Sequence, residues 1–478
     1  MPTIDNLAGR AGAWRVLLTA LVACVLAVQA GGVARGEDAR PRPAGLAPVA
    51  DFNGDGFEDY AVSAPSGRVG DKSRAGYVAV VYGTPRGVDT VRYQLLHPDN
   101  PGVGGEAAAG DRFGARAVAG DFDGDGYTDL AVGTRAIELD RRFVTLLWGG
   151  RYGLTSGVRL ADQPRTGAEP DLVDRTVGEE LASGDFNGDG TDDLAATSER
   201  GAVDVFYGPI RRDGRPARQT GLPGTYEDVT RLAAGDVTGD GRDDLISMHA
   251  WEETAEKTLF WTAGPQGFSQ RPAKLDAAAA ATVGDVDGDG YGDLVMRVIT
   301  DGFVDTLGRD KGTVKVFYGS AGGPGARTRV LTQRIPGRGH QFGYDLAAGD
   351  VNGDGYADIA AGVPHDGSGA VVLLRGGRGG LGVAGAQTFS QATPGVPGTA
   401  EAKDLFGTSV ALRDFNGDGR ADLGVGAPGE DSTAAGSGAA WVLPGSPGGL
   451  LTTGSLSFDP STLHASDAGS QLGAWTAK

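Results

Sequence analysis

The nonapeptide DFDGDGYTD, residues 121–129, decides the fold because near copies of it recur along the chain at intervals of some tens of residues. Self-similarity at such a spacing indicates an architecture built by stacking or radial repetition of one small unit. A chance origin is excluded by the number of copies. The other six copies are DFNGDGFED from Asp51, DFNGDGTDD from Asp185, DVTGDGRDD from Asp236, DVDGDGYGD from Asp285, DVNGDGYAD from Asp350 and DFNGDGRAD from Asp414.

Short apolar segments flank each copy, such as residues 117–119 before it and residues 130–132 after it. They are too short for helices and rich in small and β-branched residues, so each copy is expected to be a loop between two strands. A third strand should end on an aromatic residue and a glycine, as at Gly149, and a fourth should follow, as at residues 91–96. Four strands per unit predict an all-β, seven-bladed β-propeller with the loops between the first and second strands of the blades.

The oxygen donors of the loop are arranged as in a calcium site. Side chains at positions one, three, five and nine can converge on a hard cation, and glycine at position six permits the sharp turn. An EF-hand is excluded because position twelve, Val132 in the second copy, never carries a carboxylate and the flanking segments are strand-like. Magnesium would require a stricter octahedron, and zinc would require cysteine or regularly spaced histidine ligands.

The expected cofactor is therefore Ca²⁺, about seven ions with a structural role, and Thr238 should make the fourth site the weakest. The predicted ligands are Asp51, Asn53, Asp55, Asp59, Asp121, Asp123, Asp125, Asp129, Asp185, Asn187, Asp189, Asp193, Asp236, Thr238, Asp240, Asp244, Asp285, Asp287, Asp289, Asp293, Asp350, Asn352, Asp354, Asp358, Asp414, Asn416, Asp418 and Asp422.

The motifs around the loops resemble the FG-GAP repeat family, the integrin α N-terminal-like and VCBS-type propellers. Phe-Gly elements or near relatives precede the loops at Phe113-Gly114, Val177-Gly178, Phe342-Gly343 and Phe406-Gly407, and Gly-Ala-Pro-like elements follow at Ser63-Ala64-Pro65, Gly362-Val363-Pro364 and Gly426-Ala427-Pro428. The resemblance implies a seven-bladed propeller from about Gly45 with calcium loops and an adhesive role. Units four and five lack both elements and are expected to diverge most.

The chain ends in a further FG-type element, Ser470-Gln471-Leu472-Gly473, that no eighth loop follows. The first strand is expected near Gly45. The sequence leaves open whether the final segment pairs with blade one or only caps the ring.

The N-terminus reads as an export signal, since Arg10 and Arg15 precede the apolar run 16–28 and a small-residue cleavage site ends at Ala30. We expect a signal peptide over 1–30, a linker over 31–44 and the propeller over 45–478, with no transmembrane segment. The product should be secreted and monomeric. Cys24 is the only cysteine and lies in a lipobox-like context, so the alternative is a lipid anchor at the outer face of the membrane.

The formal net charge of −19 argues against nucleic acid or an anionic membrane as a partner, because both require a basic face. The excess of arginine over lysine is typical of a GC-rich bacterial genome.

No catalytic constellation emerges from the sequence, and no catalytic residue is assigned. His340 and His365 could approach one another, but loop histidines without a catalytic role are the better interpretation, and Glu179-Glu180 reads as a solvated pair. The favoured function is an extracellular binding or adhesion module for a protein or a cell-wall carbohydrate. The alternative is an extracellular enzyme, a polysaccharide lyase or hydrolase, on the same scaffold.

Among the tryptophans, Trp148 and Trp441 are expected in the core at the ends of third strands. Trp251 and Trp261 flank a polar insert and are the better candidates for exposure.

Overall fold

The computed structural model describes residues 50–136, 141–160, 178–198, 201–222, 227–252, 254–300, 302–303, 312–331, 341–432, 434–466 and 469–478. These residues belong to one compact unit, Pro43–Lys478. The expected signal peptide, the linker and Cys24 lie outside the described residues. Within the described residues, no helix is long and apolar enough to cross a membrane.

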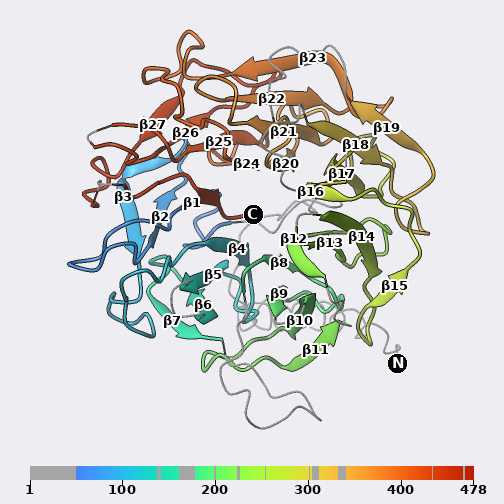
Figure 1. Ribbon diagram of the computed structural model, residues 1–478, viewed down its shortest axis with the longest axis horizontal. Helices are drawn as coiled ribbons and strands as arrows, with labels where there is room; N and C mark the ends of the chain where they lie inside the picture. The colour runs from blue at the N-terminus through green and yellow to red at the C-terminus, as the bar shows by residue number, and fades with distance from the viewer. Residues whose placement is uncertain are drawn as a thin grey trace, which may run out of the picture. The chain divides into compact units, whose positions relative to one another are not determined.

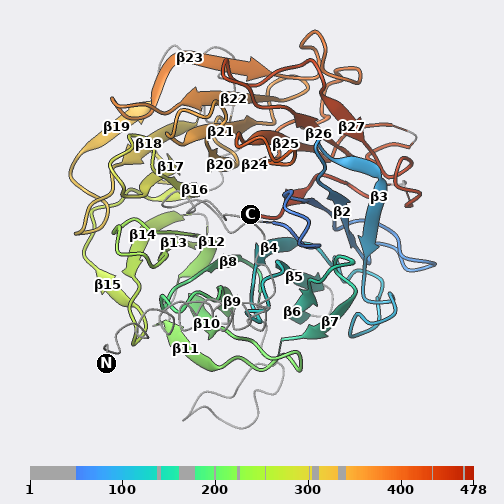
Figure 2. The ribbon, with the colours of Figure 1, turned by 180° about the vertical axis from the view of Figure 1, so that it is seen from behind.

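Seven four-stranded antiparallel sheets make up the described chain, which confirms the predicted seven-bladed β-propeller. Each sheet is one blade, and the blades radiate from a common centre (Figures 1 and 2). We number the blades by their acidic loops, so that blade one carries Asp51 and blade seven carries Asp414. The innermost strands, from blade one to blade seven, are β28 (Trp475–Thr476), β4 (Arg116–Gly120), β8 (Leu181–Gly184), β12 (Asp228–Gly235), β16 (Ala278–Gly284), β20 (Leu346–Gly349) and β24 (Ser409–Arg413).

Outward from these strands, each blade adds three more in sequence order. The second strands are β1 (Tyr60–Ala64), β5 (Asp129–Ala136), β9 (Asp193–Ser198), β13 (Asp244–Trp251), β17 (Asp293–Val298), β21 (Asp358–Val363) and β25 (Asp422–Ala427). The third strands are β2 (Tyr77–Tyr82), β6 (Arg141–Trp148), β10 (Ala202–Tyr207), β14 (Thr254–Thr262), β18 (Thr313–Phe317), β22 (Ala370–Arg375) and β26 (Ala439–Leu443). The outer strands are β3 (Asp89–Leu96), β7 (Ser156–Arg159), β11 (Arg218–Leu222), β15 (Ser269–Arg271), β19 (Thr328–Leu331), β23 (Gly382–Phe389) and β27 (Leu456–Phe458).

The ring closes through the C-terminal strand, which the sequence left undecided. β28 pairs with β1, with Val62 opposite Thr476 and Ser63 opposite Trp475. It also contacts β4 of blade two and β24 of blade seven, so the innermost strands touch one another around the whole circle. Blade one is thus built from both ends of the propeller, and the chain ends at the centre of the ring (Figure 1).

This closure corrects the expectation of a first strand near Gly45. The innermost strand of blade one comes from the C-terminal end of the chain, and the first strand along the described chain is β1, which starts at Tyr60. Gly45 itself lies outside the described residues. In blade one, therefore, the acidic loop leads into β1 but does not follow an innermost strand along the described chain.

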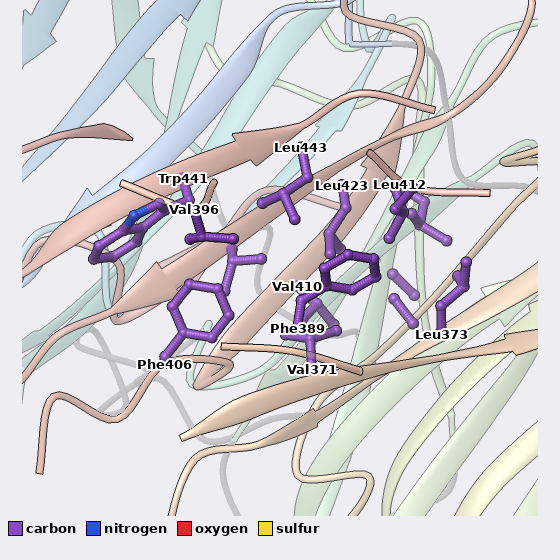
Figure 3. Packing of buried hydrophobic residues seen from close by; sticks show 14 of the residues in the cluster. Val371, Leu373, Phe389, Val396, Phe406, Val410, Leu412, Leu423, Trp441 and Leu443 are labelled. Carbon is purple, nitrogen blue, oxygen red and sulfur yellow. The ribbon is translucent and has the colours of Figure 1, made fainter. Parts of the chain in front are cut away.

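Apolar side chains fill the spaces between neighbouring blades, because both faces of each sheet are covered. Figure 3 shows such a cluster between blades six and seven, where Val371 and Leu373 of β22 meet Val410 of β24. In the same cluster the rings of Phe406 and Trp441 pack edge to face with centroids 5.2 Å apart. This burial, at roughly 25 cal/mol for each square ångström of apolar surface, holds the blades against one another.

The FG and GAP elements meet inside each blade that has both. The N–H of Gly343 donates to the carbonyl of Gly362 at 2.9 Å, and Gly407 donates to Gly426 at 3.0 Å. The C-terminal FG-type element repeats this bond, since Gly473 donates to Ser63 at 3.1 Å. The final segment therefore supplies blade one with its FG turn.

Blades four and five replace the FG turn by a longer innermost strand, as their divergent sequences suggested. Their strands β12 and β16 continue past a register shift, between Val229 and Arg231 in one and between Ala278 and Ala280 in the other. A bulge of this kind absorbs one extra residue and bends the strand, so it takes over the role of the turn.

Candidate metal centre

The predicted ligand residues lie in the seven loops that connect the first and second strand positions of the blades or, for most position-nine aspartates, at the first residue of the second strand. In the loop of blade two, the Asp121 carboxylate accepts backbone N–H bonds from Gly124 (2.8 Å), Asp125 (3.1 Å) and Gly126 (2.9 Å). The loops that start at Asp51, Asp185, Asp285 and Asp350 repeat all three bonds, and those of Asp236 and Asp414 repeat two. The backbone thus fixes the first carboxylate.

The aspartate at position nine lies at the base of each loop and is almost completely buried. Asp129 opens strand β5, accepts the N–H of Phe122 at 3.0 Å on Oδ2 and that of Gly149 at 2.7 Å on Oδ1. The second bond ties the loop to the end of the third strand. All seven residues at this position accept such a bond from a residue one or two positions after the third strand.

Burial raises the pKa of these position-nine carboxyls above their ordinary value, because an anion loses its hydration there. The pKa is raised to about 8 for Asp59, Asp129 and Asp193, and to about 7 for Asp293 and Asp422. Neighbouring loop aspartates raise it further by repulsion. A bound cation would reverse this balance and keep the carboxylates ionised.

Two loops bring three carboxylate oxygens within 4.8 Å of one another: Asp121, Asp123 and Asp129 in blade two, and Asp285, Asp287 and Asp289 in blade five. The other five loops contain no such triplet of acidic groups among the described residues. Two buried oxygens in the loops have no hydrogen-bond partner, the hydroxyl of Thr238 and Oδ1 of Asp287.

The donors fit a calcium ion on chemical grounds. All of them are oxygens of carboxylates, amides or a hydroxyl, which a hard cation prefers. The two buried oxygens without a partner belong to Thr238 and Asp287, and both residues stand at position three of their loops, which is a predicted ligand position. The loops could therefore hold Ca²⁺ through positions one, three, five and nine.

Hydrogen bonds link each loop to the next one around the ring. The N–H of the residue at position eight donates to the carbonyl of the position-one aspartate in the preceding blade, for example Asp192 to Asp121 at 3.1 Å. The last bond, Glu58 to Asp414 at 3.3 Å, closes the circle. The other donors and acceptors are Thr128 and Asp51, Asp243 and Asp185, Gly292 and Asp236, Ala357 and Asp285, and Ala421 and Asp350.

A packing contact accompanies these bonds and involves glycine at position four, which the sequence reasoning did not single out. At Gly288 (φ +74°) an added Cβ would lie 2.6 Å from the ring of Tyr356, the position-seven residue of the next blade. At Gly290, the position-six glycine (φ +89°), a Cβ would meet nothing within 4 Å. The presence of glycine at position four in all seven copies was the available signal.

We predict that Gly288→Ala destabilises the protein more than Gly290→Ala. Both substitutions put alanine at a positive φ, which costs about 1 kcal/mol, but only the first also forces Tyr356 out of its position, at a further cost of about 1–3 kcal/mol. Urea unfolding of the two variants in calcium buffer measures the difference. Equal losses would mean that the contact between the loops contributes no stability.

Blade six differs from the others because an arginine pairs with its position-nine aspartate. Arg375 Nη1 lies 3.1 Å from Asp358 Oδ2, and its Nη2 donates to the carbonyl of Gly448 in blade seven at 2.7 Å. Burial still raises the Asp358 pKa, though only to about 6, since the guanidinium favours the ionised form.

The opposite edge of the blades, where the second and third strands meet, carries exposed aromatic residues. Trp251 at the end of β13 and Phe303, in the connection between β17 and β18, are each 50% exposed. Phe303 forms an isolated β-bridge with Thr254, the first residue of β14. The expected exposure of Trp251 is confirmed, but that of Trp261 is wrong. Trp261 is buried and donates its indole N–H to Ser247 at 2.9 Å, because it points into the core between blades.

The predictions for two tryptophans and an acidic pair outside the loops were partly confirmed. Trp148 and Trp441 are buried, as predicted. Glu180 is not solvated: it is buried and pairs with Arg116 at 2.5 Å, since it lies at the start of an innermost strand. His340 lies outside the described residues, so its approach to His365 stays a prediction.

The chain matches the model of the FG-GAP repeat and that of an FG-GAP-like repeat. The first covers residues 43–81, 113–136, 342–374 and 406–443, and the second covers residues 185–247. The fifth loop falls outside these segments, in agreement with its divergent motifs.

Curated relatives include integrin α subunits and a phospholipase. The chain is 32% identical over 270 residues to integrin alpha pat-2 of Caenorhabditis briggsae, covering 48% of this chain and 21% of the relative. It is 29% identical over 221 residues to integrin alpha-PS2 of Drosophila melanogaster (40% and 15%), and 30% identical over 178 residues to the phosphatidylinositol-glycan-specific phospholipase D of Rattus norvegicus (35% and 20%). The chain thus spans about a fifth or less of the length of these relatives.

Solved structures with a similar chain path include the Dos1 propeller, with a TM-score of 0.43, 11% identity and coverage of 84% of both chains. Another is the rhamnogalacturonan lyase YesW, with a TM-score of 0.39, 14% identity and coverage of 80% of this chain and 70% of the lyase. Similarity at this level bears on neither activity nor ligand.

Proposed function

Because the chain carries FG-GAP repeats in a seven-bladed propeller similar to part of integrin α subunits, we propose that it is a secreted, calcium-binding module for extracellular binding or adhesion. Calcium in the seven loops stabilises the ring and takes no part in a reaction. The partner is an extracellular protein or a cell-wall carbohydrate.

The observation that carries the structural role of calcium is the continuous circle of bonds between the loops. Each position-one aspartate contributes its carboxylate to its own loop and its carbonyl to the next blade, as Asp121 does with Gly126 and Asp192. An ion that fixes this residue also fixes the contact between blades.

The recognition surface in this proposal is the edge of the blades opposite the loops. Binding residues are commonly presented by loops on a rigid scaffold, and half-exposed aromatic rings such as Trp251 and Phe303 can stack on a sugar or pack against a protein side chain. These two residues lie in blades four and five, where the repeat itself is most altered.

A glycan array and a panel of extracellular matrix proteins, each probed with and without calcium, test this function. We expect calcium-dependent binding that Trp251→Ala weakens at least about tenfold, because a central aromatic anchor is typically worth about 2 kcal/mol or more and about 1.4 kcal/mol corresponds to tenfold. Tyr152→Ala is the matched control, since Tyr152 is also an exposed aromatic residue but lies between the third and outer strands.

A turnover assay on the same polysaccharides decides between the two classes of function. Binding without turnover supports the adhesion module. Cleavage of a bound polysaccharide would contradict it and favour the lyase or hydrolase alternative.

A further inference from the structure

The loops of blades two and five differ from the other five at position three. They carry Asp123 and Asp287 there, where the others have asparagine or threonine, so each contains four aspartates at the ligand positions. Both side chains are largely buried, with 8% and 5% of their surface exposed. A fourth carboxylate in so small a space adds like-charge repulsion.

In blade two an arginine from the neighbouring blade meets this additional charge. Arg212 lies in the connection between β10 and β11 of blade three, and its Nε is 2.7 Å from Asp123 Oδ2. Its Nη2 is also 2.7 Å from Asp125 Oδ2, so one guanidinium spans positions three and five. The contact is positioned by the backbone, because the N–H of Ile210 donates to the carbonyl of Phe122 at 2.6 Å.

In blade five a different arginine reaches the equivalent carboxylate. Arg327 precedes strand β19 of the same blade, and its Nη1 lies 2.5 Å from Asp287 Oδ2. Its guanidinium also stacks on the ring of Tyr318 at 3.7 Å. Oδ1 of Asp287 is buried without a partner, so one oxygen of this carboxylate holds the arginine and the other remains for a cation.

Both arginines lie between the third and outer strands of a blade, but Arg212 comes from the neighbouring blade and Arg327 from the blade of the loop itself, and they meet the same position. The ion pairs of the remaining loops, in the described part of the chain, are of other kinds. Arg242 and Arg420 pair with a position-five aspartate from inside their own loops, and Arg375 pairs with position nine. In both loops, therefore, an arginine contacts position three, and in both loops position three is an aspartate.

We propose that Arg212 and Arg327 are resident counter-ions that offset the fourth carboxylate of these loops and thereby lower their affinity for calcium. This inference rests on the proposed calcium binding by the loops. The arginines hold the metal-free loop together, and they oppose the ion when it binds. With the arginine in place, the charge presented by each loop equals that of the loops in blades one and three, which have asparagine at position three.

The Coulomb energy sets the size of the effect. A unit positive charge some ångströms from a divalent ion weakens binding by about tenfold or more, even with the strong screening of an exposed site. Replacing the arginine by neutral glutamine should therefore tighten calcium binding at that loop by about this factor. It should also destabilise the metal-free protein, because four carboxylates are then left without compensation.

Isothermal titration of calcium into the full propeller tests the proposal with the double variant Arg212→Gln/Arg327→Gln. We expect two sites that bind calcium about tenfold or more tightly than any site of the unmodified protein. In chelator the melting temperature should be lower than that of the unmodified protein, whereas in saturating calcium it should be equal or higher. The matched control is Arg211→Gln/Arg329→Gln, which removes two exposed arginines that do not contact the ligand positions.

A second variant separates charge from structure. Adding Asp123→Asn and Asp287→Asn to the double variant recreates the three-carboxylate loops, so calcium affinity should return to that of the unmodified protein. The proposal is overturned if the double variant binds calcium with unchanged or weaker affinity, since the arginines would then only support the loops. If the unmodified protein binds no calcium at all, its own titration shows that the proposed calcium binding is wrong. That outcome is distinct from a failure of the arginine proposal, which the comparison with the double variant shows.

Discussion

Removing calcium with a chelator is expected to lower the melting temperature of this protein by about 10 °C or more and to make its loops sensitive to protease. A ligand that binds only the folded state adds about 2.7 kcal/mol for each site when its concentration is one hundred times the dissociation constant. Three such sites would contribute about 8 kcal/mol, which is comparable with the whole unfolding free energy of an ordinary domain.

The effect should exceed that of losing isolated surface sites, because the loops are joined to one another. The bond from Glu58 to Asp414 links blade one to blade seven, and each neighbouring pair of blades has its counterpart. Loosening one loop therefore weakens contacts in two blades. Differential scanning calorimetry in calcium and in chelator measures the loss, with magnesium at the same concentration as the control for ion specificity.

The difference in melting temperature between calcium and chelator should depend on pH, and the buried carboxyls define the direction of that dependence. The raised pKa of residues such as Asp129 and Asp193, about 8, means that the metal-free folded chain binds protons more tightly than the unfolded chain. Its stability is therefore lost as the pH rises from about 4 to 8, while calcium binding strengthens over that range. The gap in melting temperature between calcium and chelator should widen from pH 5 to pH 8. A constant gap would contradict the role of these aspartates as ligands.

Deleting residues 474–478 should open the ring and destabilise the protein by about 5 kcal/mol or more. The deletion removes strand β28, including the N–H bond from Ala477 to Ala61 at 3.1 Å. It also removes the Trp475 indole, which donates to Ala117 at 3.2 Å and lies 4.3 Å from the guanidinium of Arg116. Each lost buried hydrogen bond costs about 1 kcal/mol, and loss of the buried apolar surface of the strand adds the rest.

The deletion leaves β1 as an unpaired edge in the middle of the molecule, so aggregation should accompany the loss of stability. Size-exclusion chromatography and thermal unfolding measure both effects. A synthetic peptide of residues 474–478 is expected to restore the melting temperature of the truncated protein when added in excess, because it can pair with Val62 and Ser63 as the native strand does. Deletion without loss of stability would show that the ring does not depend on this strand.

The repeat made the blade predictable because its signals are local. The loop motif and the apolar segments on either side of it lie within a few residues of one another, so strands such as β4 and β5 and the loop at Asp121 could be placed without knowledge of distant contacts. The candidate ligands follow from the same short motif. The FG and GAP elements were recognised as markers, but their mutual hydrogen bond, as between Gly343 and Gly362, could not be inferred from their spacing.

The misjudged residues are those whose environment comes from other blades. Trp261 flanks a polar insert in sequence, yet it is buried in the cluster that contains Val205 and Tyr207 of blade three. Glu180 sits in an acidic pair, yet Arg116 of the preceding blade neutralises it. A single sequence does not state which side chains of adjacent blades meet, since those contacts join residues about one repeat apart.

By itself, then, the sequence determined the all-β class, the number of blades and the positions of the acidic loops, because each of these is written within one repeat and repeated seven times. Only the tertiary structure decided how the ring closes and that position eight of each loop donates a hydrogen bond to position one of the loop in the preceding blade. It also decided that Arg212 and Arg327 face the two loops that carry a fourth carboxylate. Ring closure, the bonds between loops and the contact of Arg212 depend on the angle between neighbouring blades, which the packing of their apolar faces sets. The contact of Arg327 depends on the path of the connection before β19, and no local pattern encodes either one.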